Sequence, residues 1–380
     1  MSLRVISNLA DLEEVKAFWE TWQVSPNSDF EHFQLVCRLR PQVERPHVMV
    51  LERSGAACAL LCARLEQSSF APRIGYFNLL KIPAVVLTIL HEGLVGGLDS
   101  EAMRMVVEHL WSLLASGEAD AVIFSELSEH SPLVTALMDH APAWWCEKKP
   151  AWSTHRSMAL GDEPGFLLKN MRSKHRAWIR KKERELESAF PGKVLWQWMS
   201  RFNDIAELSA GLETVAARTY QRGLGAGFVD NEEHRRRLGL FAGRGQLRVQ
   251  LLEIEERIRA YWIGLVYRGV FHSWATAYDP DLREYEPGTL VFLRLVDELA
   301  REGVRKIDFG LGDAHYKERF GDESWREATF TMFAPTLKGF AIRSLLGSCA
   351  AVDDLSRRFL HRTGLFDRIK TGWRKHLSGR

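Results

Sequence analysis

The chain of 380 residues lacks any long apolar run. Its richest stretch, Ile82 to Leu98, is interrupted by Pro83, His91, Glu92 and three glycines, and it falls short of the ~18 apolar residues that a membrane-spanning helix needs. The opening residues, MSLRVISNLADLEEVK, carry acids early and have no continuous apolar core, which is not the pattern of a secretory signal peptide. We therefore expect a cytoplasmic protein without a membrane span.

Cysteine is also scarce, with residues 37, 58, 62, 146 and 349 making up all five. An odd number at irregular spacing favours reduced thiols over a disulfide framework. Cys58 and Cys62 lie four residues apart in an alternating apolar run, with no second Cys or His pair nearby. Buried strand thiols are therefore a better interpretation than a zinc site, and we predict no metal.

The chain has little net charge, only +2, but the charge is unevenly spread. The range 169–187 holds eight basic and three acidic residues, and the range 338–380 holds ten basic and three acidic residues. Such runs are usually solvated faces, but they also suit anionic partners. In the 338–380 tail, Leu, Phe and Trp recur at helical spacing opposite Arg. This pattern favours contact with a membrane surface, a polyanionic glycan precursor or a cyclic dinucleotide. Stacking aromatics do not alternate with these cations, so we expect no DNA partner.

The hydrophobic content of 46% and charged content of 26% are typical of a globular chain, and the length suffices for two domains. In the second half, periodicity and turn residues predict one ordered series of strands and helices. It comprises a strand over 194–199, helices over 203–221 and 230–241 (the second capped by Asp230), strands over 246–253, 259–267 and 270–278, a helix over 286–300, a strand over 304–309, a helix over 314–320 and a strand over 328–333.

The first half shows a less regular version of the same series. The predicted elements are strands over 47–52, 56–66, 74–80 and part of 84–91, a helix over 99–114, a strand over 121–125, a helix over 132–140 and a short apolar segment over 143–146. Three strands, helix, strand, helix, strand thus recurs after about 185 residues, which indicates an internal duplication.

Three motifs in the second half can be compared with known families. They are Ala277-Tyr278-Asp279, Pro287-Gly288-Thr289-Leu290, and the run from Asp308 to Asp313 (DFGLGD) followed by Tyr316-Lys317. With the basic run 172–184, they resemble the FemAB-like branch of the GNAT acetyltransferase superfamily. Within that branch they are most similar to the group linked to bacterial cellulose, capsule and holdfast synthesis. The resemblance covers residues 169–333 well, and the first half only through its order of elements.

This resemblance implies an α/β (α+β) fold of two tandem GNAT-like domains, each a mixed, mostly antiparallel sheet flanked by helices. We expect a degenerate domain over 1–160, a domain with the active site over 161–337, and a basic helical tail over 338–380. Family members transfer an acyl group from acyl-CoA, or in Fem enzymes from aminoacyl-tRNA, to an amine. We therefore expect an N-acetyltransferase that uses acetyl-CoA and acts on an amino sugar or polysaccharide precursor. The alternatives are a tRNA-dependent Fem-like transferase and a catalytically degenerate, nucleotide-responsive module.

The resemblance also assigns roles to particular residues. Tyr316 matches the tyrosine that protonates the departing thiolate, and Lys317 the lysine that Fem enzymes are thought to use for carbonyl or phosphate charge. Because neighbours on a helix point about 100° apart, we expect at most one of the two to face the reaction centre. Asp313 could cap their helix or orient the amine.

Other candidates follow from position and chemistry. Residues Pro287, Gly288, Thr289 and Leu290 open a helix whose N-terminus could hold the donor's phosphates, although the superfamily's multi-glycine phosphate loop is absent. His272 has a pKa range suited to general base catalysis. The predicted acceptor contacts are Tyr278, Asp279, Arg218, Tyr220 and Arg222.

Overall fold

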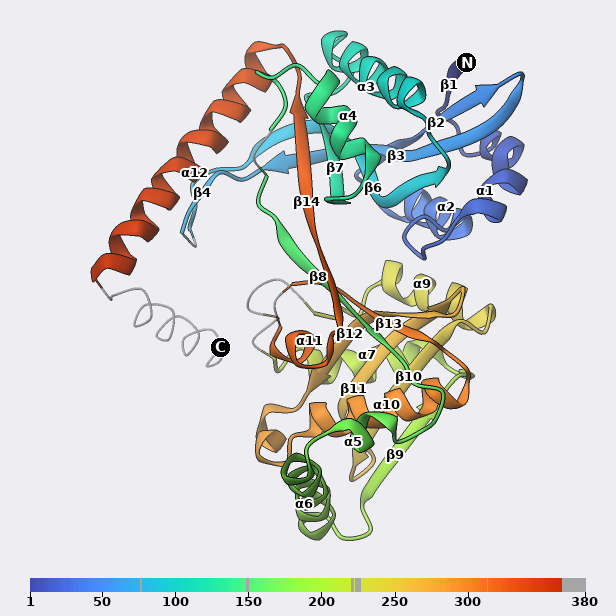
Figure 1. Ribbon diagram of the computed structural model, residues 1–380, viewed down its shortest axis with the longest axis vertical. Helices are drawn as coiled ribbons and strands as arrows, with labels where there is room; N and C mark the ends of the chain where they lie inside the picture. The colour runs from blue at the N-terminus through green and yellow to red at the C-terminus, as the bar shows by residue number, and fades with distance from the viewer. Residues whose placement is uncertain (76, 148–149, 220–221, 223–226, 313, 364–380) are drawn as a thin grey trace. The chain divides into compact units, whose positions relative to one another are not determined.

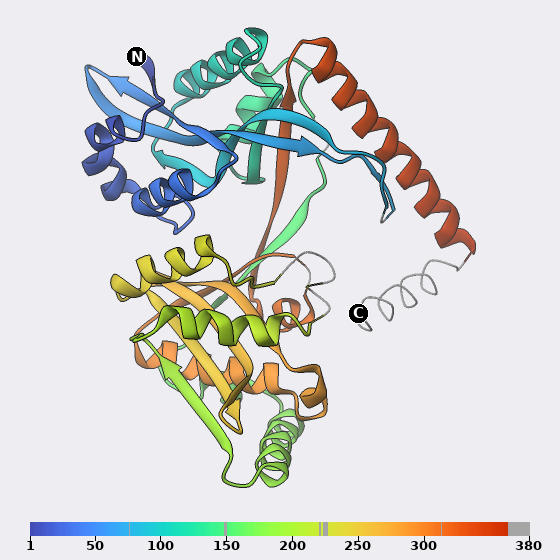
Figure 2. The same ribbon diagram turned by 180° about the vertical axis from the view of Figure 1, so that it is seen from behind.

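The computed structural model describes residues 1–75, 77–147, 150–219, 222, 227–312 and 314–363. These residues divide into two compact units: unit 1 contains residues 1–154 and 325–363, and unit 2 contains residues 155–324. Figures 1 and 2 show the chain from opposite sides. The predicted Asp313 and Tyr220, and the tail beyond residue 363, lie outside the described residues.

Unit 2 contains one six-stranded layer in the order β8-β13-β12-β11-β10-β9. The bounds of these strands are β8 Ser153–Ala159, β9 Val194–Met199, β10 Leu247–Ile254, β11 Arg257–Tyr267, β12 Val270–Tyr278 and β13 Lys306–Leu311. The helices are α5 Phe166–Asn170, α6 Ser173–Ala189, α7 Ile205–Ala216, α9 Glu232–Gly243, α10 Pro287–Arg301 and α11 His315–Phe320, with the 3₁₀ turn η2 at Pro280–Tyr285. The predicted strands and helices of this half are confirmed to within a few residues.

Helices cover both faces of this layer (Figure 2). Alternating strand residues divide the core accordingly: Trp262 and Phe271 pack with α10 on one face, whereas Tyr261 and Ile263 pack with α7 and α9 on the other. Asp204 caps α7 by accepting bonds from two backbone N–H groups. The predicted cap of α9 was wrong by one residue. Asn231 caps that helix, and the Asp230 carboxylate instead binds Ser209 and Arg235.

Unit 1 repeats the same arrangement in the order β1-β2-β3-β6-β7-β14. The strands are β1 Ser2–Ile6, β2 Val43–Arg53, β3 Ala56–Phe70, β6 Ile82–Gly96, β7 Ala121–Ser128 and β14 Glu323–Phe333, with a small hairpin of β4 Arg73–Ile74 and β5 Phe77–Asn78. The helices are α1 Lys16–Trp22, α2 Phe30–Leu39, α3 Ser100–Ala115, α4 Pro132–His140 and α12 Leu337–Thr363, with the 3₁₀ turn η1 at Asp11–Val15. In each unit one strand pair is parallel, β6 with β7 and β12 with β13, so the predicted duplication is confirmed.

The two halves exchange their last strands. β8, at the end of the first half, pairs with β13 in unit 2, and β14, at the end of the second half, pairs with β7 in unit 1. The predicted segment 143–146 is not the closing strand of the first half; it contributes a single bridge, from Cys146 to Met332. The compact units therefore do not follow the contiguous predicted ranges 1–160 and 161–337.

In unit 1 the opening beside the parallel pair is bridged by the unit's own side chains. The described register of β6 with β7 ends at Ile89↔Phe124. Just beyond it, the ring of His91 lies 3.5 Å from a Glu126 oxygen, 3.4 Å from a Glu327 oxygen and 3.2 Å from the Asn27 amide nitrogen. Burial by itself lowers the pKa of His91, but its hydrogen bond to Glu327 and the nearby carboxylates raise the pKa above its usual value.

This raised pKa makes a prediction about stability. A group whose pKa is higher in the folded state stabilises the protein below its unfolded pKa of 6.5, and the contribution disappears as the pH rises through the folded pKa. We expect His91→Gln to lower the free energy of unfolding by about 1 to 2 kcal/mol more at pH ~5.5 than at pH ~8.5. Urea titrations of both proteins at the two pH values measure this difference; an equal loss at both would contradict it.

Candidate active site

The candidate site begins where two parallel strands separate. The described register of β12 with β13 ends at His272↔Asp308, and β12 then continues to Tyr278. β13 is redirected by a bulge between Asp308 and Gly310, where Gly310 has φ +70°. β12 carries its own bulge at Trp274, between the pairs Gly264↔Ser273 and Ile263↔Ala275. Bulges of this kind often re-aim side chains beside active sites.

Gly264 is needed at this bulge. A Cβ atom there would lie 2.4 Å from the His272 carbonyl oxygen and 2.4 Å from the Phe271 ring. Only glycine permits so close an approach of the two strands. The sequence thus sets the point at which β12 bends.

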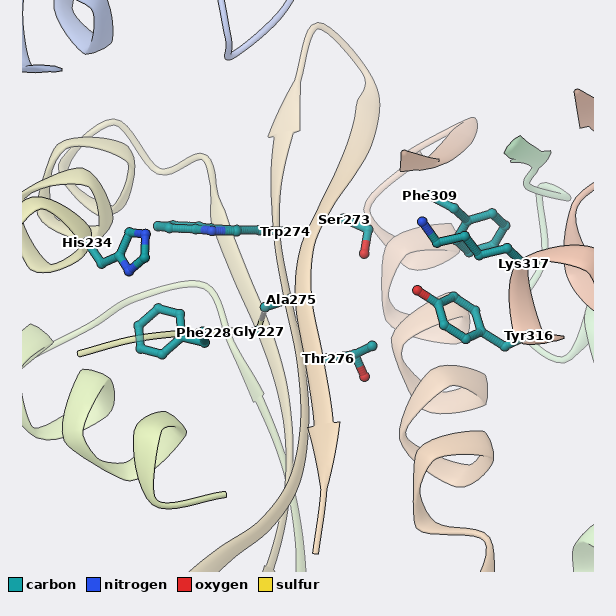
Figure 3. A pocket seen from close by; sticks show the side chains of 10 residues that line it. All are labelled: Gly227, Phe228, His234, Ser273, Trp274, Ala275, Thr276, Phe309, Tyr316 and Lys317. Atoms are coloured by element: carbon teal, nitrogen blue, oxygen red, sulfur yellow. The ribbon is translucent and has the colours of Figure 1, made fainter. Parts of the chain in front are cut away.

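A pocket of about 270 Å³ lies at this separation. The lining residues come from β12, the end of β13, α11, and the segment leading into α9 (Figure 3): Gly227, Phe228, His234, Ser273, Trp274, Ala275, Thr276, Phe309, Tyr316 and Lys317. Residues on both sides of β12 line the same pocket. This pocket can therefore hold two reactants that meet end to end.

Tyr316 stands at one end of the pocket. Its ring packs edge-on against Trp262 at 5.1 Å and Phe309 at 5.9 Å between centroids. Figure 3 shows its hydroxyl pointing toward β12. Aromatic packing on two sides fixes the ring while the polar end stays at the pocket. The predicted thiolate acid therefore has a defined position.

Lys317 lines the same end, so the expectation that only one of the two neighbours would face the site was wrong. Its side chain is buried, and its ammonium donates to the carbonyl oxygens of Leu311 at 2.6 Å and Gly310 at 3.2 Å. The long stem lets the ammonium bend back to the end of β13. These bonds hold a positive charge beside the pocket, where it can stabilise a developing anion.

At the other end, three rings form a group that the sequence interpretation missed. Phe228 and His234 stack at 5.4 Å between centroids, and Trp274 meets them edge-on at 6.0 and 5.5 Å. The Arg237 guanidinium lies 4.2 Å from the Trp274 ring centre. The only sequence signal was an aromatic residue in a strand already assigned to the site; nothing marked Phe228 or His234.

The tautomer of His234 follows from its contacts. Its Nδ1 lies 2.5 Å from the Val229 carbonyl oxygen, which can only accept a hydrogen bond. Nδ1 therefore carries the proton, and in the neutral ring Nε2 is left as a proton acceptor. This is the property that a general base requires.

The predicted base His272 is not among the pocket-lining residues. Its Nδ1 lies 3.6 Å from one oxygen of Asp308, while His155 Nε2 binds the other oxygen at 2.5 Å. Burial alone would raise the pKa of Asp308, but the His155 hydrogen bond and the charges of both histidines hold it below its usual value. Asp308 thus fixes His272 beside the strand separation, and a catalytic role for His272 stays a prediction.

The predicted phosphate cradle lies outside the pocket. α10 begins at Pro287, as predicted, but Glu286 precedes it with φ +56° and its carboxylate accepts a bond from the Thr289 hydroxyl at 3.3 Å. A Cβ at Gly288 would lie 3.2 Å from the Tyr278 ring. Pro287 and Leu290 are buried. In this conformation the Tyr278 ring and the Glu286 carboxylate lie at the helix start, so donor binding at 287–290 requires them to move.

A guanidinium and a neutral imidazole meet near this helix start. Arg319 on α11 contacts the ring of His175 on α6, and both lie within electrostatic range of Glu286. Burial, followed by the charge of Arg319, lowers the pKa of His175. The Arg319 guanidinium is a suitable partner for a phosphate. It lies one turn along α11 from Tyr316.

The other predicted acceptor contacts are engaged within the fold. Asp279 is buried, caps η2, and pairs with Arg218 and Arg259. Arg222 binds Glu213 at 2.7 Å and donates to the Phe228 carbonyl at 2.6 Å, so it supports the aromatic group. None of these side chains lines the described pocket, and their contact with substrate stays a prediction.

The chain was next compared with known proteins. Residues 173–318 match the family described as "Acetyltransferase (GNAT) domain", a range that contains every residue of the pocket. This match indicates an acyltransferase and implies an acyl-CoA donor. No curated protein matches the chain in sequence.

Among solved structures, FemX is 10% identical, with a TM-score of 0.56 over 88% of this chain and 97% of its own. A tandem GNAT protein from the clavulanic acid biosynthesis pathway is 13% identical, with a TM-score of 0.53 over 88% of this chain and 99% of its own. Both likenesses confirm the predicted fold of two tandem GNAT domains. In the described part of the chain, no helix is long and apolar enough to span a bilayer.

The position of Tyr316 makes a prediction about turnover. Tyr316→Phe keeps the ring packing but removes the hydroxyl, so we expect kcat to fall about 10²-fold while the Kd for acyl-CoA changes little. Tyr285→Phe, a partly buried tyrosine of the same unit outside the pocket, is the matched control. Steady-state kinetics and calorimetry measure both quantities. An unchanged kcat in the Tyr316 variant would exclude the acid role.

Proposed function

We propose that this chain is an N-acyltransferase that moves an acyl group, with acetyl as the expected one, from acyl-CoA to the amine of an amino sugar in a polysaccharide or cell-envelope precursor. The observation that carries the proposal is the Tyr316 hydroxyl in a pocket at the separation of β12 and β13. At this separation the pantetheine arm of the donor can form hydrogen bonds with the edge of β12 that β13 leaves. The thioester then lies at the Tyr316 hydroxyl.

The reaction needs few groups from the protein. The amine nitrogen attacks the thioester carbonyl, a C–N bond forms, and the C–S bond breaks. Water along the pocket relays the proton that the amine loses to His234 Nε2 at the other end, and Tyr316 gives its proton to the departing thiolate. The buried ammonium of Lys317 stabilises the negative charge that develops on the thioester carbonyl as the amine attacks.

The acceptor class rests on His234 and Trp274, which line the pocket and are partly exposed, with the buried Phe228 packed against both. Flat aromatic faces suit the apolar faces of a sugar ring, and they also add to binding beyond the area that they bury. An amine carried on such a ring would point along the pocket toward the thioester. This arrangement supports an amino sugar over a peptide side chain as the acceptor.

One observation favours a second donor. Glu286 places a carboxylate at the start of α10, where a phosphate-binding helix would have none, and the resemblance includes Fem enzymes that use aminoacyl-tRNA. A Fem-like transfer from charged tRNA is therefore the alternative.

The direct test is thiol release from acetyl-CoA in the presence of amino sugars. We expect CoA release that depends on both the protein and a glucosamine-type acceptor, and that RNase treatment does not change. Calorimetry should detect acetyl-CoA at millimolar concentration. Transfer that needs charged tRNA and disappears with RNase would instead support the alternative, and no acetyl-CoA binding would contradict the proposal.

Variants of the aromatic group extend the same assay. Trp274→Ala should raise the acceptor KM about tenfold with little change in the donor KM. His234→Gln should lower kcat about 10²-fold. Trp196→Ala is the matched control, because Trp196 also stacks with an arginine, Arg294 at 4.2 Å, but lies outside the pocket. Equal effects of the two tryptophan variants would contradict an acceptor role.

A further inference from the structure

Unit 1 exposes an apolar hairpin that takes no part in the acyl transfer proposed above. β3 and β6, each 15 residues long, continue into the β4–β5 hairpin. The chain from Gln67 to His91 contains no Asp or Glu. In the hairpin, Phe77, Leu79 and Leu80 are 69%, 53% and 46% exposed. Adjacent exposed apolar side chains of this kind mark an interaction surface.

Cations flank these apolar residues. Arg73 precedes the hairpin turn and Lys81 follows Leu80, and both are exposed. An apolar tip between basic residues suits the boundary of a bilayer, because the tip enters the acyl region while the cations stay among the headgroups.

Helix α12 lies beside this hairpin. Its inner side, with Ile342 and Cys349, is buried against the rest of unit 1. Its other side also carries exposed apolar residues: Leu337, Phe340, Leu345, Val352 and Leu355. The Asp353 carboxylate accepts a bond from the Gly75 backbone at 2.9 Å, so this helix and the hairpin are joined. Both ribbon views show α12 beside β4 (Figures 1 and 2).

An exposed tryptophan lies at the other end of this helix. Trp144 is 77% exposed, and the Arg343 guanidinium lies 5.9 Å from its ring centre. Tryptophan is enriched at membrane–water interfaces, where its amphipathic ring sits at headgroup level. Trp144 therefore adds a third element to the surface.

We propose that the β4–β5 hairpin, Trp144 and the outer side of α12 form a docking face for an anionic lipid bilayer. The charge favours lipid: residues 338–380 contain ten Arg or Lys and three Asp. Lysine is depleted at protein–protein interfaces, whereas here the exposed Lys81 directly follows Leu80. The face lies on the bilayer without crossing it, and it does not depend on the acyl transfer.

Vesicle co-sedimentation of the full chain tests this face. We expect binding to vesicles of phosphatidylcholine with phosphatidylglycerol, at least about tenfold weaker binding to phosphatidylcholine alone, and weaker binding as salt rises. Phe77→Ser/Leu80→Ser should weaken binding about tenfold or more. Arg73→Gln/Lys81→Gln should weaken it about 30-fold.

Leu195→Ser is the matched control, because Leu195 is 50% exposed on β9 in unit 2 and should not affect vesicle binding. The changed side chains are exposed, and an unchanged acetyl-CoA Kd and melting temperature show that the variants fold. Hairpin variants that bind vesicles as the unchanged protein does would overturn the proposal. So would a dimer, seen by light scattering, that the hairpin variants dissociate while vesicles remain unbound.

Discussion

The separation of β12 from β13 is the constraint on which the site depends. Three residue pairs hold the strands together, and the bulges at Trp274 and Asp308–Gly310 then part them. Gly264 makes the first bulge possible because any side chain there would meet the β12 backbone. At the same bulge, Ser273 points toward Trp262 and Trp274 points toward α9. This one irregular stretch of β12 therefore contributes to both ends of the pocket.

The two strand separations of the duplicated fold differ in the side chains that lie beside them. In unit 2 the pocket is lined by side chains with catalytic chemistry, Tyr316, Lys317 and His234. In unit 1 the equivalent position is bridged by His91 with Glu126 and Glu327. This partly buried histidine links carboxylates of two strands of the unit. The first repeat thus closes its strand separation with its own side chains, whereas the second has a pocket there.

The sequence predicted the repeat well because strand alternation, helix caps and turn glycines are local signals. Asp99, Asp204 and Pro287 each opened the expected helix. The exchange of β8 and β14 could not be predicted, since neither sequence specifies its pairing partner and only pairing decides the unit. Tyr316 was singled out because the family resemblance assigns a tyrosine to this position after a strand, whereas Phe228 and His234 lie in a segment without periodicity. Lys317 was misjudged because helical spacing ignores how far a lysine stem can bend.

The most direct test of this account is a crystal structure of the protein with CoA. The account predicts the CoA sulfur within about 3.5 Å of the Tyr316 hydroxyl, with the pantetheine amides bonded to the β12 backbone between Ser273 and Thr276. CoA bound away from this strand, with the phenol remote from its sulfur, would contradict it.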